Sequence, residues 1–326
     1  MSKMWNFRPD LYDQMAPYYR VPPEVFKSIR FVAVAWSFFG ARIYVLGISI
    51  LTWFYFSPPL EACRDFGIDW VAQIWIRNFT IALVVAGSLH LYFYTYRKQG
   101  DIDKYDPRDL SRNSRKFHFN NQVWDNMFWT LASAVSFWTF YEALLMWAYA
   151  NQITTLVEFT DSPAWFVFLL FVTPWWNGFY FYWQHRMFHI PVLYKLAHNW
   201  HHKNINIGPW SGAAMHPLEH LVWLSAVLVL LWLDSHPIHA IFVLQLQMLT
   251  AITAHCGYEN LHFGNGYRFR LGDFFRQLHH RFFDCNYGTV ETPWDHWFNT
   301  YHDGSPEGDQ RMKQRRQELI RNKAGG

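Results

Sequence analysis

Four apolar stretches, each about long enough to cross a lipid bilayer, constrain the fold of this chain more than any other feature. A spanning helix needs about 20 residues, and only helices or closed barrels satisfy their backbone hydrogen bonds in hydrocarbon. Aromatic residues make up 21% of the chain and charged residues only 16%, against roughly 25% charged in soluble domains. The stretches run approximately over Phe31–Phe56, Phe79–Tyr96, Asn126–Ala150 and Pro163–Trp183. We therefore expect an all-α, multi-pass membrane helical bundle with four spans.

The charges of the connecting loops set the expected orientation. The loop Arg97–Lys116 is basic, whereas the loops near residues 61–69 and 158–161 are acidic. Cytoplasmic loops carry the excess of Lys and Arg, so the N-terminus and everything after Trp183 should be cytoplasmic. Arg42 and Glu142 lie within expected spans and should face the bundle interior, because unpaired charge is costly in lipid.

A fifth apolar region, within about residues 221–254, is interrupted by Asp234-Ser-His-Pro237. Each half is short for a complete span. We expect a hairpin that enters the membrane and returns; two full spans joined by a tight turn would give the same topology. The tail from Asp309 onward is polar and basic and predicts a solvated helix.

Histidines gather in the second half of the chain with the spacing of metal ligands. His185 and His189 are four residues apart, and His198, His201 and His202 begin nine residues later. On a helix, residues three or four apart share one face, and neutral imidazole is the commonest transition-metal ligand. Adjacent clusters of this kind have no packing rationale, since buried imidazoles need partners. The sequence therefore predicts a metal site just beyond the fourth span, in a cytoplasmic histidine-rich cap.

The supply of histidines exceeds what one metal ion can use. A hydrolytic zinc site takes three protein ligands, often in the order His-Glu-x-x-His, and a structural zinc site uses cysteines. Neither pattern occurs, and the three cysteines are scattered. An imidazole-rich cage for two metals, in a membrane protein, indicates activation of O₂ against an unactivated C–H bond. A net charge of +3 is too small to argue for nucleic acid.

Several motifs in order along residues 163–304 resemble the fatty acid hydroxylase/sterol desaturase superfamily. The motifs are His185-Arg-Met-Phe-His189, His198-Asn-Trp-His201-His202, His216-Pro-Leu-Glu219, His255-Cys-Gly-Tyr-Glu259, Leu278-His279-His280-Arg-Phe-Phe-Asp-Cys-Asn-Tyr-Gly288 and Asp295-His-Trp-Phe-Asn-Thr-Tyr-His302-Asp303-Gly304. The resemblance implies a non-haem di-iron enzyme that uses O₂ to hydroxylate or desaturate a lipid. Electrons would come from a separate carrier, such as cytochrome b5 or ferredoxin with its reductase. The absence of a dinucleotide-binding glycine motif in the sequence agrees with a separate donor.

The resemblance also implies a set of ligands, with His201, His202 and His279 as its catalytic members. The ligands would be His185, His189, His198, His201, His202, His255, His279 and His280. His216 and His220 are candidates for ligation or for support of the ligands, and Glu259 and His262 are candidate replacement ligands. No organic cofactor is expected, and zinc can replace iron because it binds nitrogen sites more tightly than Fe²⁺ does.

The chain departs from the family pattern at two positions. Arg276 stands where the third His-x-x-His-His motif usually begins with histidine, and Asn299 stands where glycine is usual. Arginine cannot ligate a metal. We therefore expect either an open position on one iron completed by Glu259 or His262, with Arg276 paired to a carboxylate such as Asp273, or a rotated helix with Arg276 facing solvent.

Sterol or sterol-like C-5 desaturation is the favoured reaction, because the motifs at His216 and His255 look closer to that branch. The alternatives are a fatty-acyl or ether-lipid hydroxylase, a metallohydrolase, or a membrane metal-binding or transport protein. The expected location is the inner membrane or the endoplasmic reticulum, with a cytoplasmic catalytic face. The expected regions are 1–184 with four spans, 185–304 with the histidines and the hairpin, and a tail at 305–326.

Overall fold

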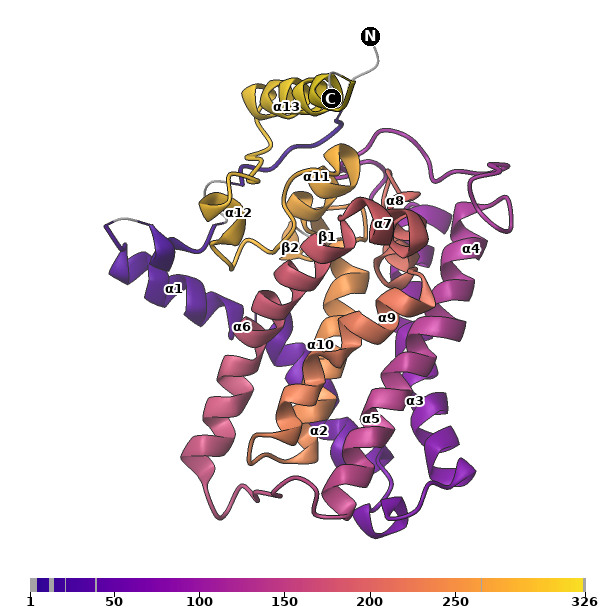
Figure 1. The fold of residues 1–326 in the computed structure, drawn as a ribbon, viewed down its shortest axis with the longest axis vertical. Helices are drawn as coiled ribbons and strands as arrows, with labels where there is room; N and C mark the ends of the chain where they lie inside the picture. Colours follow the sequence, from indigo (N-terminus) through magenta and orange to yellow (C-terminus); the bar gives the residue numbers. More distant parts are fainter. Residues whose placement is uncertain (1–4, 12–14, 21, 39, 265, 325–326) are drawn as a thin grey trace.

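The structure, a computed structural model, is a bundle of long helices with a cap of short helices at one end (Figure 1). It describes residues 5–11, 15–20, 22–38, 40–264 and 266–324. The long elements are α2 (Ala41–Phe56), α3 (Ile68–His90) with the π-helical η4 (Leu91–Thr95), α4 (Gln122–Phe128) with η5 (Trp129–Ala134) and α5 (Val135–Ala150), α6 (Pro163–Phe188) and α10 (Pro237–Ala254). The N-terminal α1 (Val25–Ala35) projects sideways from the bundle (Figure 1).

The remaining elements build the cap or join neighbouring helices. Figure 1 shows them mainly at the end of the bundle where α6 and α10 finish. They are η2 (Pro17–Tyr19), η3 (Leu60–Cys63), α7 (Pro191–Leu193), η6 (Tyr194–His198), α8 (Asn199–His202), η7 (Pro209–Ala213), α9 (Pro217–Leu224), η8 (Ser225–Leu231), β1 (Asn260–Phe263), β2 (Tyr267–Arg270), α11 (Phe274–Phe282), α12 (Trp294–Trp297) and α13 (Pro306–Ala324). The fold is mainly helical as expected, but the antiparallel pair β1–β2 adds a small sheet that the all-α expectation missed. The C-terminal helix is confirmed.

Among the residues that the structure describes, three helices are long and apolar enough to cross a membrane: Ile68–Thr95, Pro163–Phe188 and Pro237–Ala254. The expected count of four spans is not confirmed. The stretch expected at Phe31–Phe56 divides between α1 and α2, and α2 has only 16 residues. Gly40 lies at the break, where a Cβ atom would come within 2.3 Å of the Ala35 carbonyl oxygen. The chain turns there because only glycine permits that approach.

The helix α3 begins earlier than the sequence predicted, at Ile68 instead of Phe79. Asp69 lies in its first turn, where the helix dipole favours negative charge. Arg77, which interrupts the apolar run, is buried and forms an ion pair with Glu142 of α5 at 2.5 Å. Pairing offsets the cost of a buried arginine in a membrane helix, so the helix continues through Arg77. Glu142 faces the interior as expected, and Arg42 also has a partner, Glu291.

The helix α10 forms the centre of the bundle. It is longer than the hairpin arm that the sequence predicted to be short for a span. It packs against α2, α3, α5 and α6, and most of its side chains are buried. Its 18 residues are sufficient for a span, whereas the preceding arm Pro217–Leu231 is shorter. The turn between the arms reaches the loop after α5, because Ser235 pairs with Leu156 and bonds the Tyr149 hydroxyl. The hairpin therefore begins and ends beside the histidine-rich cap, and its turn lies at the other end of the bundle (Figure 1).

Candidate metal centre

Eight buried or nearly buried histidines converge at the end of the bundle in two neighbouring groups. The end of α6 supplies His185 and His189, the η6–α8 helix supplies His198, His201 and His202, the C-terminus of α10 supplies His255, and α11 supplies His279 and His280. The first group contains His185, His189, His198, His202 and His279, and the second contains His201, His255 and His280. These are the same eight residues that the resemblance implied as ligands.

The ring nitrogens within each group are spaced like ligands of one ion. His198 Nε2 lies 3.1 Å from the Nε2 atoms of His185 and His189, and 3.0 Å from that of His202. His255 Nε2 lies 3.0 Å from His280 Nε2 in the second group. Two nitrogens at right angles around a metal about 2.1 Å away would be roughly 3.0 Å apart. The donor set therefore fits a pair of transition metals, one in each group.

Several ligand candidates are oriented through their second ring nitrogen. His185 Nδ1 lies 2.7 Å from the Tyr287 carbonyl oxygen, and His279 Nδ1 lies 2.6 Å from that of Cys285. His198 Nδ1 lies 2.7 Å from a carboxylate oxygen of Glu219. In each case the Nδ1–H group donates, which fixes the tautomer and leaves Nε2 with its lone pair for a metal.

Burial keeps these imidazoles in the form that binds metals. Desolvation lowers the pKa of His198 and of His201 to about 3, from an ordinary value of 6.5. The pKa values of His202, His279 and His280 also fall well below their usual range, first because of burial and then because of the neighbouring histidines. Neutral rings at physiological pH are ready to ligate without first losing a proton.

The four less certain candidates lie outside both groups. His216 caps α9, its Nδ1 accepting from the Leu218 backbone N–H. His220 uses both nitrogens, with Ser133 at 2.9 Å and the Ala213 carbonyl oxygen at 2.9 Å. Each of the other two is engaged elsewhere: the Glu259 carboxylate accepts hydrogen bonds from Tyr105 and Arg270, and His262 pairs with Asp103. The structure therefore does not bring these side chains to the metal groups.

Arg276 is buried beside the larger group. Only 4% of it is exposed, so the solvent-facing alternative is wrong. Its Nη2 donates to the Gly288 carbonyl oxygen at 2.6 Å, and its guanidinium lies 4.8 Å from the centre of the Phe181 ring. None of the described ion pairs joins it to Asp273, whose carboxylate instead caps α11 through the Phe275 N–H. Arg276 therefore places a guanidinium, which cannot ligate a metal, beside His185 of the larger group.

The loop after α11 orients two of the ligands, a role that the sequence motifs did not assign to it. The carbonyl groups of Cys285 and Tyr287 orient His279 and His185, and the side chain of Asp295 holds this loop through the backbone N–H groups of Tyr287 and Gly288. The signal in the sequence was the conjunction of Asn-Tyr-Gly with a later Asp, but spacing alone does not say that a backbone carbonyl points at a histidine.

Comparison with known proteins agrees with the motifs. The fatty acid hydroxylase family model matches residues 165–300. The chain is 32% identical over 135 residues to a Delta(7)-sterol 5(6)-desaturase of Gibberella zeae, covering 41% of each protein. It is 28% identical over 236 residues to a putative Delta(7)-sterol-C5(6)-desaturase of Arabidopsis thaliana, covering 69% of this chain and 78% of that protein. A putative methylsterol monooxygenase of Dictyostelium discoideum is 31% identical over 126 residues, covering 38% of this chain and 47% of that protein.

These matches confirm the resemblance to the fatty acid hydroxylase/sterol desaturase superfamily, and with the apolar helices they support a membrane protein of lipid metabolism. The matched part includes all eight clustered histidines. The chain spans about two fifths of the length of the Gibberella relative. No solved structure matches the chain.

Proposed function

We propose that this chain is a membrane-bound, non-haem di-iron oxidoreductase that uses O₂ to desaturate or hydroxylate a lipid. The observation that carries the proposal is the pair of neighbouring groups of buried histidines, five in one and three in the other. Iron at these positions would supply the redox chemistry that activates O₂ against a C–H bond. Sterol or sterol-like C-5 desaturation is the first choice of reaction, since two of the relatives carry the name of that activity.

The reaction needs electrons from outside the chain. Desaturation removes two hydrogens from adjacent carbons and, with O₂, two electrons and two protons, yields a double bond and two waters. Hydroxylation places one oxygen atom of O₂ in the product and releases the other as water, again with two electrons and two protons. Cytochrome b5 or ferredoxin, with its reductase, is the proposed class of donor, and a cytoplasmic position of the histidine groups, in the inner membrane or endoplasmic reticulum, would make them accessible to it.

The chain's own residues bind and orient rather than react. The eight imidazoles would hold the metals, with His201, His202 and His279 closest to the chemistry. Glu219 and the carbonyl groups of Cys285 and Tyr287 accept the Nδ1–H bonds of three of the ligands, which keeps the rings in fixed orientations. Burial excludes water from the ligand cage, which protects reactive states from unproductive side reactions.

A metal transporter is the strongest non-enzymatic alternative. Transport sites usually lie near the middle of the bilayer on interrupted helices. Here the groups form at the C-terminal ends of α6 and α10, beside the cap. This position favours an enzyme whose substrate enters from the lipid.

The experiment that tests the proposal combines metal analysis with product analysis. Protein purified in detergent should contain two iron atoms per chain, or zinc in their place after overexpression, and should convert a sterol extract only with O₂ and an added electron donor. His201→Ala should lose iron and turnover, whereas His90→Ala, outside the groups, should keep both. Turnover without O₂ would favour a hydrolase, and one metal or none in active protein would end the di-iron proposal.

A further inference from the structure

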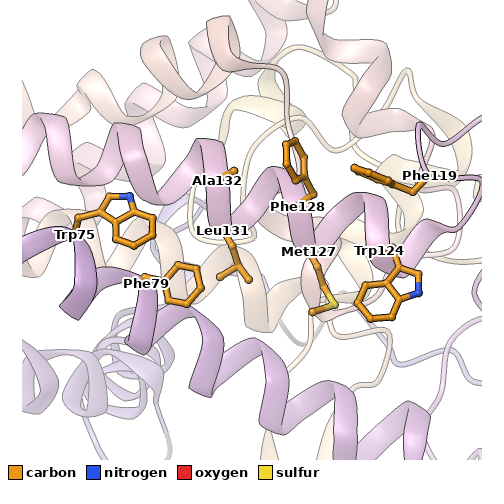
Figure 2. A pocket seen from close by; sticks show the side chains of 8 residues that line it. All are labelled: Trp75, Phe79, Phe119, Trp124, Met127, Phe128, Leu131 and Ala132. Atoms are coloured by element: carbon orange, nitrogen blue, oxygen red, sulfur yellow. The ribbon is translucent and has the colours of Figure 1, made fainter. Parts of the chain in front are cut away.

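An apolar cavity of about 600 Å³ opens between α3 and the helix formed by α4 and η5 (Figure 2). All of its lining side chains are aromatic or aliphatic: Trp75, Phe79, Phe119, Trp124, Met127, Phe128, Leu131 and Ala132. Its volume lies within the range of about 300–1,000 Å³ found for small-molecule sites. None of the lining residues belongs to the histidine groups, so this cavity is separate from the candidate metal centre.

The position of the cavity selects an occupant from the bilayer. One wall is α3, which is long and apolar enough to cross the membrane. Trp124, Phe119 and Phe128 remain substantially exposed, at 62%, 50% and 46%. The lining side chains carry two indole N–H groups: that of Trp75 donates to Ser136, and that of Trp124 belongs to an exposed side chain. A cavity that is lined by apolar side chains and faces hydrocarbon accommodates an alkyl chain.

A basic segment lies at the end of the cavity that faces the cap. Arg112, Arg115 and Lys116 are exposed and precede Phe119 closely in the chain. The described ion pairs include neither Arg115 nor Lys116. The segment is on the side of the histidine groups, because the ring of His118 lies 4.7 Å from that of Trp200. Exposed Lys and Arg residues at this level of a membrane protein attract anionic lipid headgroups, by about 1 kcal/mol each.

We propose that this cavity and the basic segment together bind one anionic glycerophospholipid, with an acyl chain between α3 and η5 and the phosphate group beside Arg115 and Lys116. The inference concerns a site apart from the reaction centre and does not depend on the proposed function. The site combines positive side chains, which attract a phosphate group, with an apolar cavity, which accommodates an acyl chain. A neutral sterol would use only the cavity, and a free phosphate only the positive side chains.

The lipid would also stabilise a helix that supports the metal centre. On the opposite face of α4, Asn126 Nδ2 donates to Asn204 Oδ1 at 2.7 Å, and Gln122 donates to the same oxygen at 3.0 Å. Asn204 in turn donates to the backbone carbonyl of His201 at 3.1 Å. Occupancy of the cavity therefore restrains α4, and through Asn204 the segment that carries His201.

The test measures lipid binding directly on the full chain. Delipidated protein in dodecyl maltoside is titrated with phosphatidylglycerol or with phosphatidylcholine of the same acyl chains, and bound lipids are counted by native mass spectrometry while thermal unfolding is followed. We expect one phosphatidylglycerol to bind at least tenfold more tightly than phosphatidylcholine and to raise the unfolding temperature. Equal affinity for the two lipids would overturn the proposal.

Two variants test the two halves of the site. Arg115→Ala/Lys116→Ala should weaken phosphatidylglycerol binding by about tenfold or more, because it removes the two positive side chains beside the lipid phosphate. The matched control Arg268→Ala/Lys313→Ala removes one Arg and one Lys from exposed positions elsewhere and should leave binding unchanged. Ala132→Trp, at an exposed wall position, fills the cavity and should weaken the binding of both lipids. Wild-type affinity in either the Arg115/Lys116 variant or the Ala132 variant would refute the site.

Discussion

Replacing Asp295 with alanine should destabilise the protein and loosen the candidate metal centre together. The Asp295 side chain is 1% exposed and accepts three hydrogen bonds. The donors are the backbone N–H groups of Tyr287 at 2.9 Å and Gly288 at 2.7 Å, and the Thr300 hydroxyl at 2.6 Å. Asp295→Ala removes all three acceptor contacts and offers the two backbone donors no substitute.

The magnitude follows from the cost of orphaned groups. An unsatisfied buried donor costs about 1–3 kcal/mol. The two backbone N–H groups, together with the Thr300 hydroxyl, which can rotate to another acceptor, therefore amount to about 3–5 kcal/mol. A typical domain is stable by about 5–15 kcal/mol, so the loss is a large fraction of the total. Asp295→Asn keeps the shape and one oxygen acceptor and should lose about half as much.

The link to the metal centre makes this prediction specific. The loop that Asp295 holds supplies the carbonyl oxygens that accept from His185 and His279. Once the loop loosens, both rings lose their orientation, and disturbed ligand support typically costs about 10–100-fold in metal affinity.

The assay is denaturant unfolding in detergent together with metal content per chain after dialysis against a weak chelator. Asp101→Ala is the control, because Asp101 is an exposed carboxylate whose ion pair with Lys104 is worth at most about 1 kcal/mol. A loss below about 1 kcal/mol for Asp295→Ala would refute the hydrogen-bond argument. A large loss of stability with unchanged metal affinity would refute the role of the loop in orienting the ligands.

Three further outcomes follow from contacts elsewhere in the bundle and cap. Glu142→Leu leaves Arg77 buried without its carboxylate partner and should lower the unfolding free energy by about 3–5 kcal/mol. The double variant Arg77→Met/Glu142→Leu should recover most of that loss. Equal losses of unfolding free energy in the single and the double variant would contradict a buried pair. Asn204→Ala should lower metal affinity without dissociating the helices, measured by chelator competition and circular dichroism, and wild-type affinity would count against its support of His201. Stripping the metal with a strong chelator should lower the unfolding temperature and its return should restore it, because a ligand that binds only the folded state stabilises that state; an unchanged temperature would contradict metal binding by the histidine groups.

The spacing of charged and apolar residues was sufficient to predict that most of the helices exist. It was not sufficient to predict the residues at which they begin and end. The part of α3 before the predicted start at Phe79 contains Arg77, and a lone arginine in lipid is costly. Its partner Glu142 lies 65 residues away, and that pairing exists only in the folded bundle. The break at Gly40 depends on a close backbone approach, and the strand pair β1–β2 depends on a short hairpin, neither of which a hydrophobic pattern records.

The sequence by itself paired His185 with His189, and His198 with His201 and His202, because a spacing of three or four residues places side chains on one face of a helix. The other three histidines were expected only from the family resemblance. The sequence also determined the membrane character of the chain and the resemblance that the comparisons confirm. Only the tertiary structure decided how the eight rings divide into groups of five and three, that His220, Glu259 and His262 bind other partners, and that Arg276 is buried against Phe181. The physical reason is that ligand grouping depends on where the ends of α6, α10 and α11 meet, and those meeting points are fixed by packing between segments far apart in the chain.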